Sequence, residues 1–214
     1  MNRFVFKRAL KNILGSFSYN PEKYWTERGK TLEKENLYDG SQFRIQEKAL
    51  VEYLSKLEFS SVLEIGCGFG RITKLMINNF PNIKSYSAID ISPDNISKTK
   101  KLFDSQKINF QVSTIQNYNP SEKYDLVLSV YVLMHVPPKE IEQVIKKSVN
   151  LSQKHVVNVD WFEQQKSNIH LGHNFIHNYD EIYEKNPSNL KVKQVPIGMD
   201  NPPTSLFHAQ IDHR

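Results

Sequence analysis

Three glycines that follow an apolar, acidic run are the residues with the clearest chemical meaning in this sequence. Residues 61–73 read SVLEIGCGFGRIT, so Gly66, Gly68 and Gly70 come after an apolar stretch that contains Glu64. A strand that enters a glycine-rich turn and leaves as a helix brings backbone N–H groups close to a bound ligand. The stretch therefore predicts a site for a nucleotide-type cofactor.

The turn departs from a dinucleotide-binding turn in two ways. A dinucleotide fingerprint has a third glycine where this chain has Arg71, and a bulky side chain there opposes the close helix–strand packing that the glycine serves. A carboxylate at Glu64 would also repel a pyrophosphate, whereas it would attract a sulfonium or ammonium group. Both departures argue against a dinucleotide.

The segment VLEIGCGFG (62–70) resembles motif I of the class I S-adenosylmethionine-dependent methyltransferases, whose pattern is apolar–apolar–acid–x–Gly–x–Gly–x–Gly. Asp90, in AIDIS, lies roughly twenty residues beyond the glycines, where a carboxylate accepts hydrogen bonds from ribose hydroxyls. The segment YDLVLSVYVLMHVPP resembles the fourth strand and following loop of the same family. The resemblance covers about residues 41–212. It implies S-adenosylmethionine as cofactor and S-adenosylhomocysteine as product.

Carried over residue by residue, the resemblance implies a set of cofactor contacts. Asp90 would hold the ribose, and Ile91 would pack on the adenine. Thr114 stands where many family members carry an acid that reaches the adenine amino group, so Thr114 and Ile115 would contact adenine only by hydroxyl or backbone. The full set is Glu64, Gly66, Cys67, Gly68, Gly70, Asp90, Ile91, Thr114, Ile115 and Ser129.

Histidines after the predicted fourth and fifth strands are the candidates for a catalytic base, because a hydroxyl acceptor must lose its proton. His135, in VLMHVPP, lies at the rim where ligands bind in open α/β sheets. The alternative for His135 is a half-buried imidazole that bonds the loop backbone. His173 and His177 follow the fifth strand, where similar small-molecule methyltransferases build the acceptor pocket, with capping and packing as the alternative.

The same histidines raise the alternative of a metal site. His170, His173 and His177 fall near helical spacing. Gly172 interrupts the helix, however, and Asp160 is the only acid that accompanies them, at a distance in sequence. We therefore expect no bound metal.

Aromatic residues complete the predicted substrate site. The segment SYNPEKYWTERGKTL (18–32) resembles the lead-in of some bacterial and archaeal methyltransferases. Tyr24, Trp25 and Arg28 are expected to form a lid over cofactor and acceptor, and packing of the aromatic rings on the domain is the alternative. Tyr131, at the end of the fourth strand, and Tyr179 are the other predicted substrate-binding residues.

Apolar segments that alternate with amphipathic ones predict the elements that must position these side chains. Strands are predicted at SVLEIG, SYSAIDIS, INFQVST, YDLVLSVYVL and KHVVNVDWF, followed by a closing pair, LKVKQVPIG and SLFHAQID. Helices are predicted between most of them. The fold class is therefore α/β, a doubly wound and mostly parallel seven-stranded sheet with helices on both faces, an antiparallel closing pair and a helical N-terminal extension.

Length and composition limit the number of domains, the classes of partner and the location that we expect for this protein. A chain of 214 residues fits one domain, with an extension at 1–40 and the methyltransferase domain at 41–214. The net charge of +5 permits contact with nucleic acid without favouring it. No run is apolar enough to span a bilayer, and the single cysteine fits a cytoplasmic protein.

The basic amphipathic segment at 1–17 leaves three readings open: packing on its own domain or on a partner subunit, as in a homodimer; peripheral membrane contact; and a transit peptide.

Together these features predict a methyltransferase that acts on an O or N atom of a small molecule, or of a carbohydrate or lipid precursor. Two alternatives remain: an RNA methyltransferase, suggested by the basic balance, and a non-catalytic scaffold that keeps the fold. The sequence does not identify the acceptor, because its pocket is built from loop residues outside the motifs.

Overall fold

The computed structural model describes residues 19–31, 40–103, 108–162, 173–186, 189–200 and 203–212. The predicted basic N-terminal segment and His170 lie outside these residues. Within them, no helix is long and apolar enough to cross a membrane.

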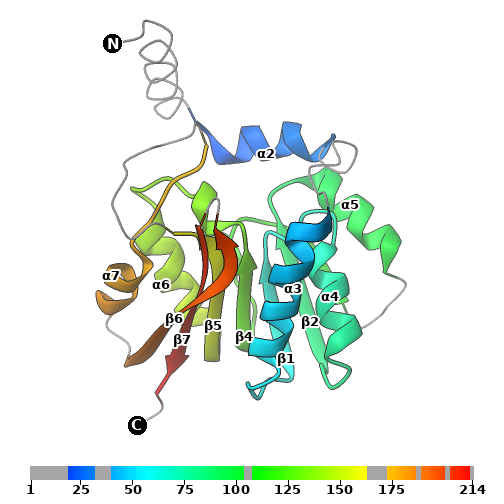
Figure 1. Cartoon of the computed structure of the whole chain (residues 1–214). Coiled ribbons are helices and arrows are strands. Elements are labelled where there is room, and N and C mark those ends of the chain that lie inside the picture. Colours follow the sequence, from blue (N-terminus) through cyan, green and yellow to red (C-terminus); the bar gives the residue numbers. More distant parts are fainter. Residues whose placement is uncertain are drawn as a thin grey trace, which may run out of the picture.

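The described strands form one seven-stranded sheet with the order β3-β2-β1-β4-β5-β7-β6 (Figure 1). The first five strands of this order pair in parallel, and β7 pairs antiparallel with both β5 and β6. The arrangement confirms the predicted fold class, including the closing pair. The strands are β1 (Ser61–Ile65), β2 (Ser85–Asp90), β3 (Ile108–Val112), β4 (Tyr124–Val130), β5 (Ser152–Trp161), β6 (Leu190–Asp200) and β7 (Pro203–Ile211).

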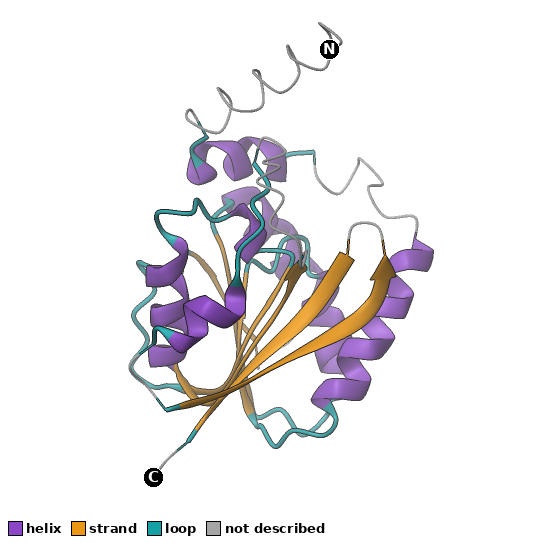
Figure 2. Cartoon of the chain, turned by 60° about the vertical axis from the view of Figure 1, so that its left-hand side comes forward, coloured by secondary structure: helices purple, strands orange, loops and turns teal. Residues whose placement is uncertain are grey.

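Helices cover both faces of the sheet (Figure 2). Successive side chains of a strand point to opposite faces, so Val62 of β1 packs in one apolar cluster and Leu63 in the other. The first cluster takes side chains from α3 (Gly40–Leu54), α4 (Arg71–Asn79) and α5 (Pro93–Leu102), and the second takes them from α6 (Ile141–Leu151) and α7 (Tyr179–Glu184). This double cover explains why β4 is buried along its whole length.

Helix α2 (Pro21–Gly29) lies apart from these layers, across the end of the sheet where the parallel strands finish (Figure 1). Its start is encoded locally, because the Asn20 side chain accepts a hydrogen bond of 2.9 Å from Lys23 N and Pro21 occupies the first turn. Its place over the strand ends is the first indication that it covers a site.

Two boundaries differ from the sequence-based prediction for a structural reason. The chain leaves β4 through a short 3-10 turn, η1 (Leu133–His135), and the helix that the amphipathic segment PPKEIEQVIKKSVNLS (137–152) predicts begins only at Ile141. The predicted connection at 199–204 is largely strand, because β6 continues to Asp200 and pairs with Pro203 of β7 beyond an irregularity in the ladder.

Candidate functional site

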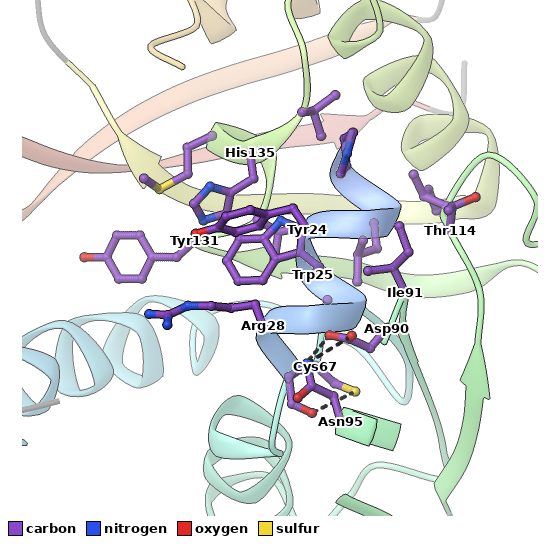
Figure 3. Close-up of a pocket in the computed structure, with 18 of the residues that line it drawn as sticks. Tyr24, Trp25, Arg28, Cys67, Asp90, Ile91, Asn95, Thr114, Tyr131 and His135 are labelled. Carbon is purple, nitrogen blue, oxygen red and sulfur yellow. Dashed lines mark hydrogen bonds between the residues drawn. The ribbon is translucent and has the colours of Figure 1, made fainter. Parts of the chain in front are cut away.

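A pocket of about 800 Å³ lies between α2 and the carboxyl ends of the parallel strands (Figure 3). Its volume is typical of small-molecule sites, which run from roughly 300 to 1,000 Å³. The glycine turn, the end of β2, the loop after β3 and the loop after β4 all contribute to its lining. This is the edge where open α/β sheets bind ligands.

The glycine turn is tied to β2 and leaves one face open to the pocket. Gly66 N and Cys67 N both donate to Ile89 O, at 2.7 and 3.1 Å. Gly68 has a φ of +54°, and a Cβ added there would meet nothing within 4 Å. The backbone at Gly68 is thus exposed to whatever enters the pocket, whereas a Cβ at Gly66 would lie 2.5 Å from Val132 Cγ2.

Glu64 lies beneath this turn and also lines the pocket. Its carboxyl group is 2% exposed and accepts hydrogen bonds from the Thr73 and Tyr86 hydroxyls. Burial raises its pKa to about 7, against the hydrogen bonds from Thr73 and Tyr86, which lower it. A positive charge in the pocket would favour the ionised form of this carboxyl.

Asp90, at the end of β2, is the acid best placed to bind polar groups of a ligand. Its Oδ2 accepts from Gly68 N at 2.9 Å, and its Oδ1 accepts from Ser92 N at 2.8 Å and from Asn95 Nδ2 at 3.2 Å. Burial raises its pKa, and these three donors oppose the shift. Since two carboxylate oxygens have about four lone-pair sites, Asp90 keeps acceptor capacity for a hydroxyl.

The predicted adenine contacts form one wall of the pocket. Ile91, Thr114 and Ile115 all line it, together with Ser113. The Thr114 hydroxyl accepts a hydrogen bond of 3.2 Å from Asn117 N, so it closes its own turn. The wall offers apolar side chains and backbone, which suits a flat ring better than a charged group.

His135 lies in the pocket opposite this wall and is held in one tautomer. Its Nδ1 is 3.1 Å from the carbonyl oxygen of His173, and because a carbonyl only accepts, Nδ1 carries the proton. Nε2 is then the nitrogen with the lone pair. Burial lowers the pKa of His135 to about 4, so the ring is neutral near pH 7.

Helix α2 supplies aromatic side chains that lie over His135 in the pocket (Figure 3) and also contact His173. The ring of Tyr24 stacks on His173 at 4.5 Å, and Trp25 lies 4.6 Å from His135, centroid to centroid. Trp25 Nε1 donates to the hydroxyl of Tyr19, which in turn donates to His135 O. Arg28 lines the same pocket. The predicted lid residues are therefore brought together over the pocket.

Four of the predicted site residues do not line the pocket: Gly70, Ser129, His177 and Tyr179. His177 Nε2 donates to Val136 O at 3.0 Å. Tyr179 is fully buried, with its ring 4.8 Å from that of Phe207. Ser129 is 3% exposed within β4.

Tyr131 does line the pocket, unlike Ser129, because its backbone departs from strand alternation. Strand alternation would put both side chains on one face. Tyr131 instead has a φ of +58°, the only positive value at a described residue other than glycine, which turns its ring to the opposite cluster, edge-on to Phe43. Such a conformation in a bulky residue marks a locally strained turn.

A buried acid behind the pocket holds the loop that carries Tyr131 and His135. Asp160 is 0% exposed, and it accepts from Met134 N at 3.2 Å and from Asn158 Nδ2 at 2.9 Å. Burial raises its pKa to about 7. Asp160 thus holds η1 in place through its hydrogen bond to Met134 N, although it does not line the pocket.

The sequence prediction missed several pocket residues, including Phe43, Asn95, Trp161 and Asn174. These come from α3, α5, the end of β5 and the segment after it, outside every motif. The alternation of side chains along β5 and the helical periodicity of α3 could have indicated which residues share a face of each element. Neither pattern indicates which face meets a ligand.

Among the described residues, no group of three or more His, Cys, Asp or Glu side chains is arranged to hold a metal ion. The arrangement offers instead a backbone cradle, a buried carboxylate with spare acceptor capacity and a neutral imidazole in one pocket. It can bind a hydroxylated ligand with a flat ring and remove a proton from a second molecule beside it.

Residues 62–155 match the protein family described as methyltransferase domain. Among curated proteins, the chain is 43% identical over 76 residues to malonyl-[acyl-carrier protein] O-methyltransferase 1 of Ilyobacter polytropus. That match covers 35% of this chain and 28% of the relative, so it spans less than a third of the relative's length.

Solved structures share the fold across most of the chain. Magnesium protoporphyrin IX methyltransferase from Synechocystis PCC 6803, with bound S-adenosylmethionine, has a TM-score of 0.69 at 15% identity and covers 91% of this chain and 99% of its own. The N-methyltransferase NodS from Bradyrhizobium japonicum WM9, in complex with S-adenosyl-L-homocysteine, has a TM-score of 0.68 at 18% identity, with 84% and 91% covered.

Proposed function

Because residues 62–155 match a methyltransferase domain and the chain shares its fold with solved methyltransferases, we propose that this chain transfers a methyl group from S-adenosylmethionine to an oxygen or nitrogen atom of a small-molecule acceptor. One observation carries the proposal. The open backbone at Gly68, the carboxylate of Asp90 and the neutral imidazole of His135 face one pocket.

The residues present fit this cofactor. The space over Gly68 admits a chain that runs close to the backbone, since a Cβ there would meet no atom within 4 Å. Asp90 has acceptor capacity for a ribose hydroxyl, and Ile91 and Ile115 offer apolar contact to an adenine. Glu64 is the acid beneath the glycine turn. A sulfonium or ammonium group in the pocket would favour the ionised form of its carboxyl group.

When bound, S-adenosylmethionine supplies a methyl group activated by a positive sulfur. The residues of the chain position the two reactants, exclude water from the pocket and supply a group that accepts the proton. His135 Nε2 accepts the proton that the acceptor loses, while the Nδ1–H bond to His173 O keeps that lone pair available. Tyr24 and Trp25 exclude water from the chamber around His135.

The pocket favours a compact acceptor, because α2 covers it and one volume of about 800 Å³ must serve both cofactor and acceptor. The relatives include an O-methyltransferase that acts on a malonyl group held by an acyl-carrier protein and an N-methyltransferase, so both atom types occur among similar chains. We assign the acceptor to the class of small molecules, including carbohydrate and lipid precursors and carrier-bound acyl groups. The buried free thiol of Cys67 fits a cytoplasmic location.

The test is transfer of an isotope-labelled methyl group by the full chain to three separate fractions: small metabolites, acyl-carrier proteins and bulk tRNA. We expect label in the first or second fraction, and loss of that label with a Gly68→Ala variant. Label only in tRNA would instead support the RNA methyltransferase. Binding of the cofactor without transfer to any fraction would support the non-catalytic scaffold.

A further inference from the structure

The end of α2 rests directly on the start of α5, and the contact requires a glycine. Gly29 is buried, and a Cβ added there would lie 2.1 Å from Ser92 Oγ and 3.1 Å from Asn95 Oδ1. Lys98 Nζ donates to Gly29 O at 2.9 Å and to Lys30 O at 3.3 Å. A cation at the last carbonyls of a helix is a favourable terminal contact. The docked position of α2 is therefore specified at this end by Gly29 and Lys98.

The two residues under Gly29 are the ones that orient Asp90. Ser92 N and Asn95 Nδ2 donate to Asp90 Oδ1. Ser92 Oγ also caps α5 by accepting from Asn95 N at 3.3 Å. Ser92 and Asn95 thus hold the Asp90 carboxylate in position and also form the surface on which α2 docks. Figure 3 shows Asp90 and Asn95 side by side under α2.

Asn95 carries an unusual feature for a residue in such a cluster. Its side chain is 2% exposed, yet its Oδ1 has no hydrogen-bond partner among the described residues. A buried carbonyl without a donor costs free energy that solvation would recover. This atom also lies against docked α2, since a Cβ at Gly29 would be 3.1 Å from it.

The middle of α2 faces the acceptor side of the pocket. Tyr24 and Trp25 contact His173 and His135, and both line the pocket with Arg28. Ligands in the pocket that contact these side chains are bound only while α2 is docked. The helix therefore spans the pocket from its ribose side to its acceptor side.

From this geometry we propose that Asn95 is a positioning residue that links cofactor binding to the docking of α2 through Gly29. The proposal rests on the proposed function and adds to it a coupling between two parts of the site. A cofactor held by Asp90 keeps Ser92 and Asn95 in the arrangement that seats Gly29, and docked α2 encloses the cofactor. Because linkage is reciprocal, docking raises cofactor affinity by the same factor by which cofactor favours docking.

The first arm of the test measures hydrogen exchange of the α2 amides and the dissociation constant of S-adenosylhomocysteine in the full chain. In the wild type, ligand should slow α2 exchange. Gly29→Ala should speed α2 exchange, abolish the effect of ligand on it and weaken binding by about 10-fold, within the usual range of coupling factors. Alanine is the better helix former, so faster exchange would not reflect a weaker helix. Lys23→Ala, on the exposed side of α2, is the matched control and should behave as the wild type.

The second arm is a double-mutant cycle of Gly29→Ala with Asn95→Ala. If both act through one contact, the double variant should bind about as weakly as either single variant, about 10-fold below the wild type. Additive losses, near 100-fold, would overturn the coupling, and so would wild-type affinity in Gly29→Ala. A wild type that binds no ligand would instead contradict the proposed function. In that case the faster α2 exchange of Gly29→Ala without ligand would still support docking through Gly29, and unchanged exchange would overturn that as well.

Discussion

Replacing Gly68 by alanine separates the fold from the proposed cofactor cradle. The added Cβ meets no atom of the protein within 4 Å, so the only cost to folding is the φ of +54°. A left-handed conformation costs a residue with a Cβ about 1–2 kcal/mol. For a chain of this size, that corresponds to a fall in Tm of about 2–8 °C. The variant should therefore fold.

Cofactor binding should suffer more than folding does. The methyl group occupies the space where the ligand must approach the backbone, and overpacking of this kind costs about 1–3 kcal/mol, or roughly 5- to 150-fold in Kd. Calorimetric titration with S-adenosylhomocysteine measures the loss. Ile145→Val, in the buried face of α6, is the matched control, since it should cost about 0.5–1.5 kcal/mol of stability without touching the pocket. A Gly68→Ala protein that unfolds a few degrees early but binds as the wild type does would refute the cradle.

Three further predictions concern buried ionisable groups. His135→Ala should lower kcat by about 10²- to 10⁴-fold with little change in cofactor Kd, and a variant that keeps its turnover would make His135 structural. Since burial lowers the pKa of His135 to about 4, the kcat of the wild type should stay flat from pH 8 to about 5.5, and a half-loss near 6.5 would show an unperturbed imidazole. Burial raises the pKa of Asp160 from 3.8 to about 7, so the native state binds the proton more tightly and this carboxyl's contribution to stability is lost as pH rises through that window. Urea unfolding at pH 5 and pH 7 should show a smaller loss of stability on raising the pH in Asp160→Asn than in the wild type; equal losses would contradict the shift.

The parts of the site that the sequence predicted are those set by local backbone. The turn at Gly66 and Gly68 is contiguous, and Asp90 follows at the end of the adjacent strand, so spacing alone brings them together. Motif residues of this kind depend on the path of one βαβ unit. The mostly parallel seven-stranded sheet and its closing pair were predicted from the alternation of apolar and amphipathic segments, whereas the order of the strands came from the structure.

What the sequence did not predict depends on packing between distant segments. Gly29 and Asn95 are 66 positions apart in the chain, and nothing in either stretch indicates that they touch. Ser129 was placed in the pocket by its match to the family pattern, whereas its side chain is 3% exposed within β4 and does not line the pocket. Tyr179 begins α7 and packs inward, a choice of face that the short helix does not reveal in sequence.

Binding of S-adenosylmethionine to the intact chain is the decisive measurement for the proposed cofactor site. Calorimetry should show one site per chain, with a Kd of about 1 μM to 1 mM, the range of ordinary enzyme substrates. Asp90→Asn should weaken it by roughly 5- to 150-fold, since it loses about 1–3 kcal/mol of charge-assisted hydrogen bonding. A folded wild-type protein that gives no heat of binding with either S-adenosylmethionine or S-adenosylhomocysteine would rule out the proposed cofactor site.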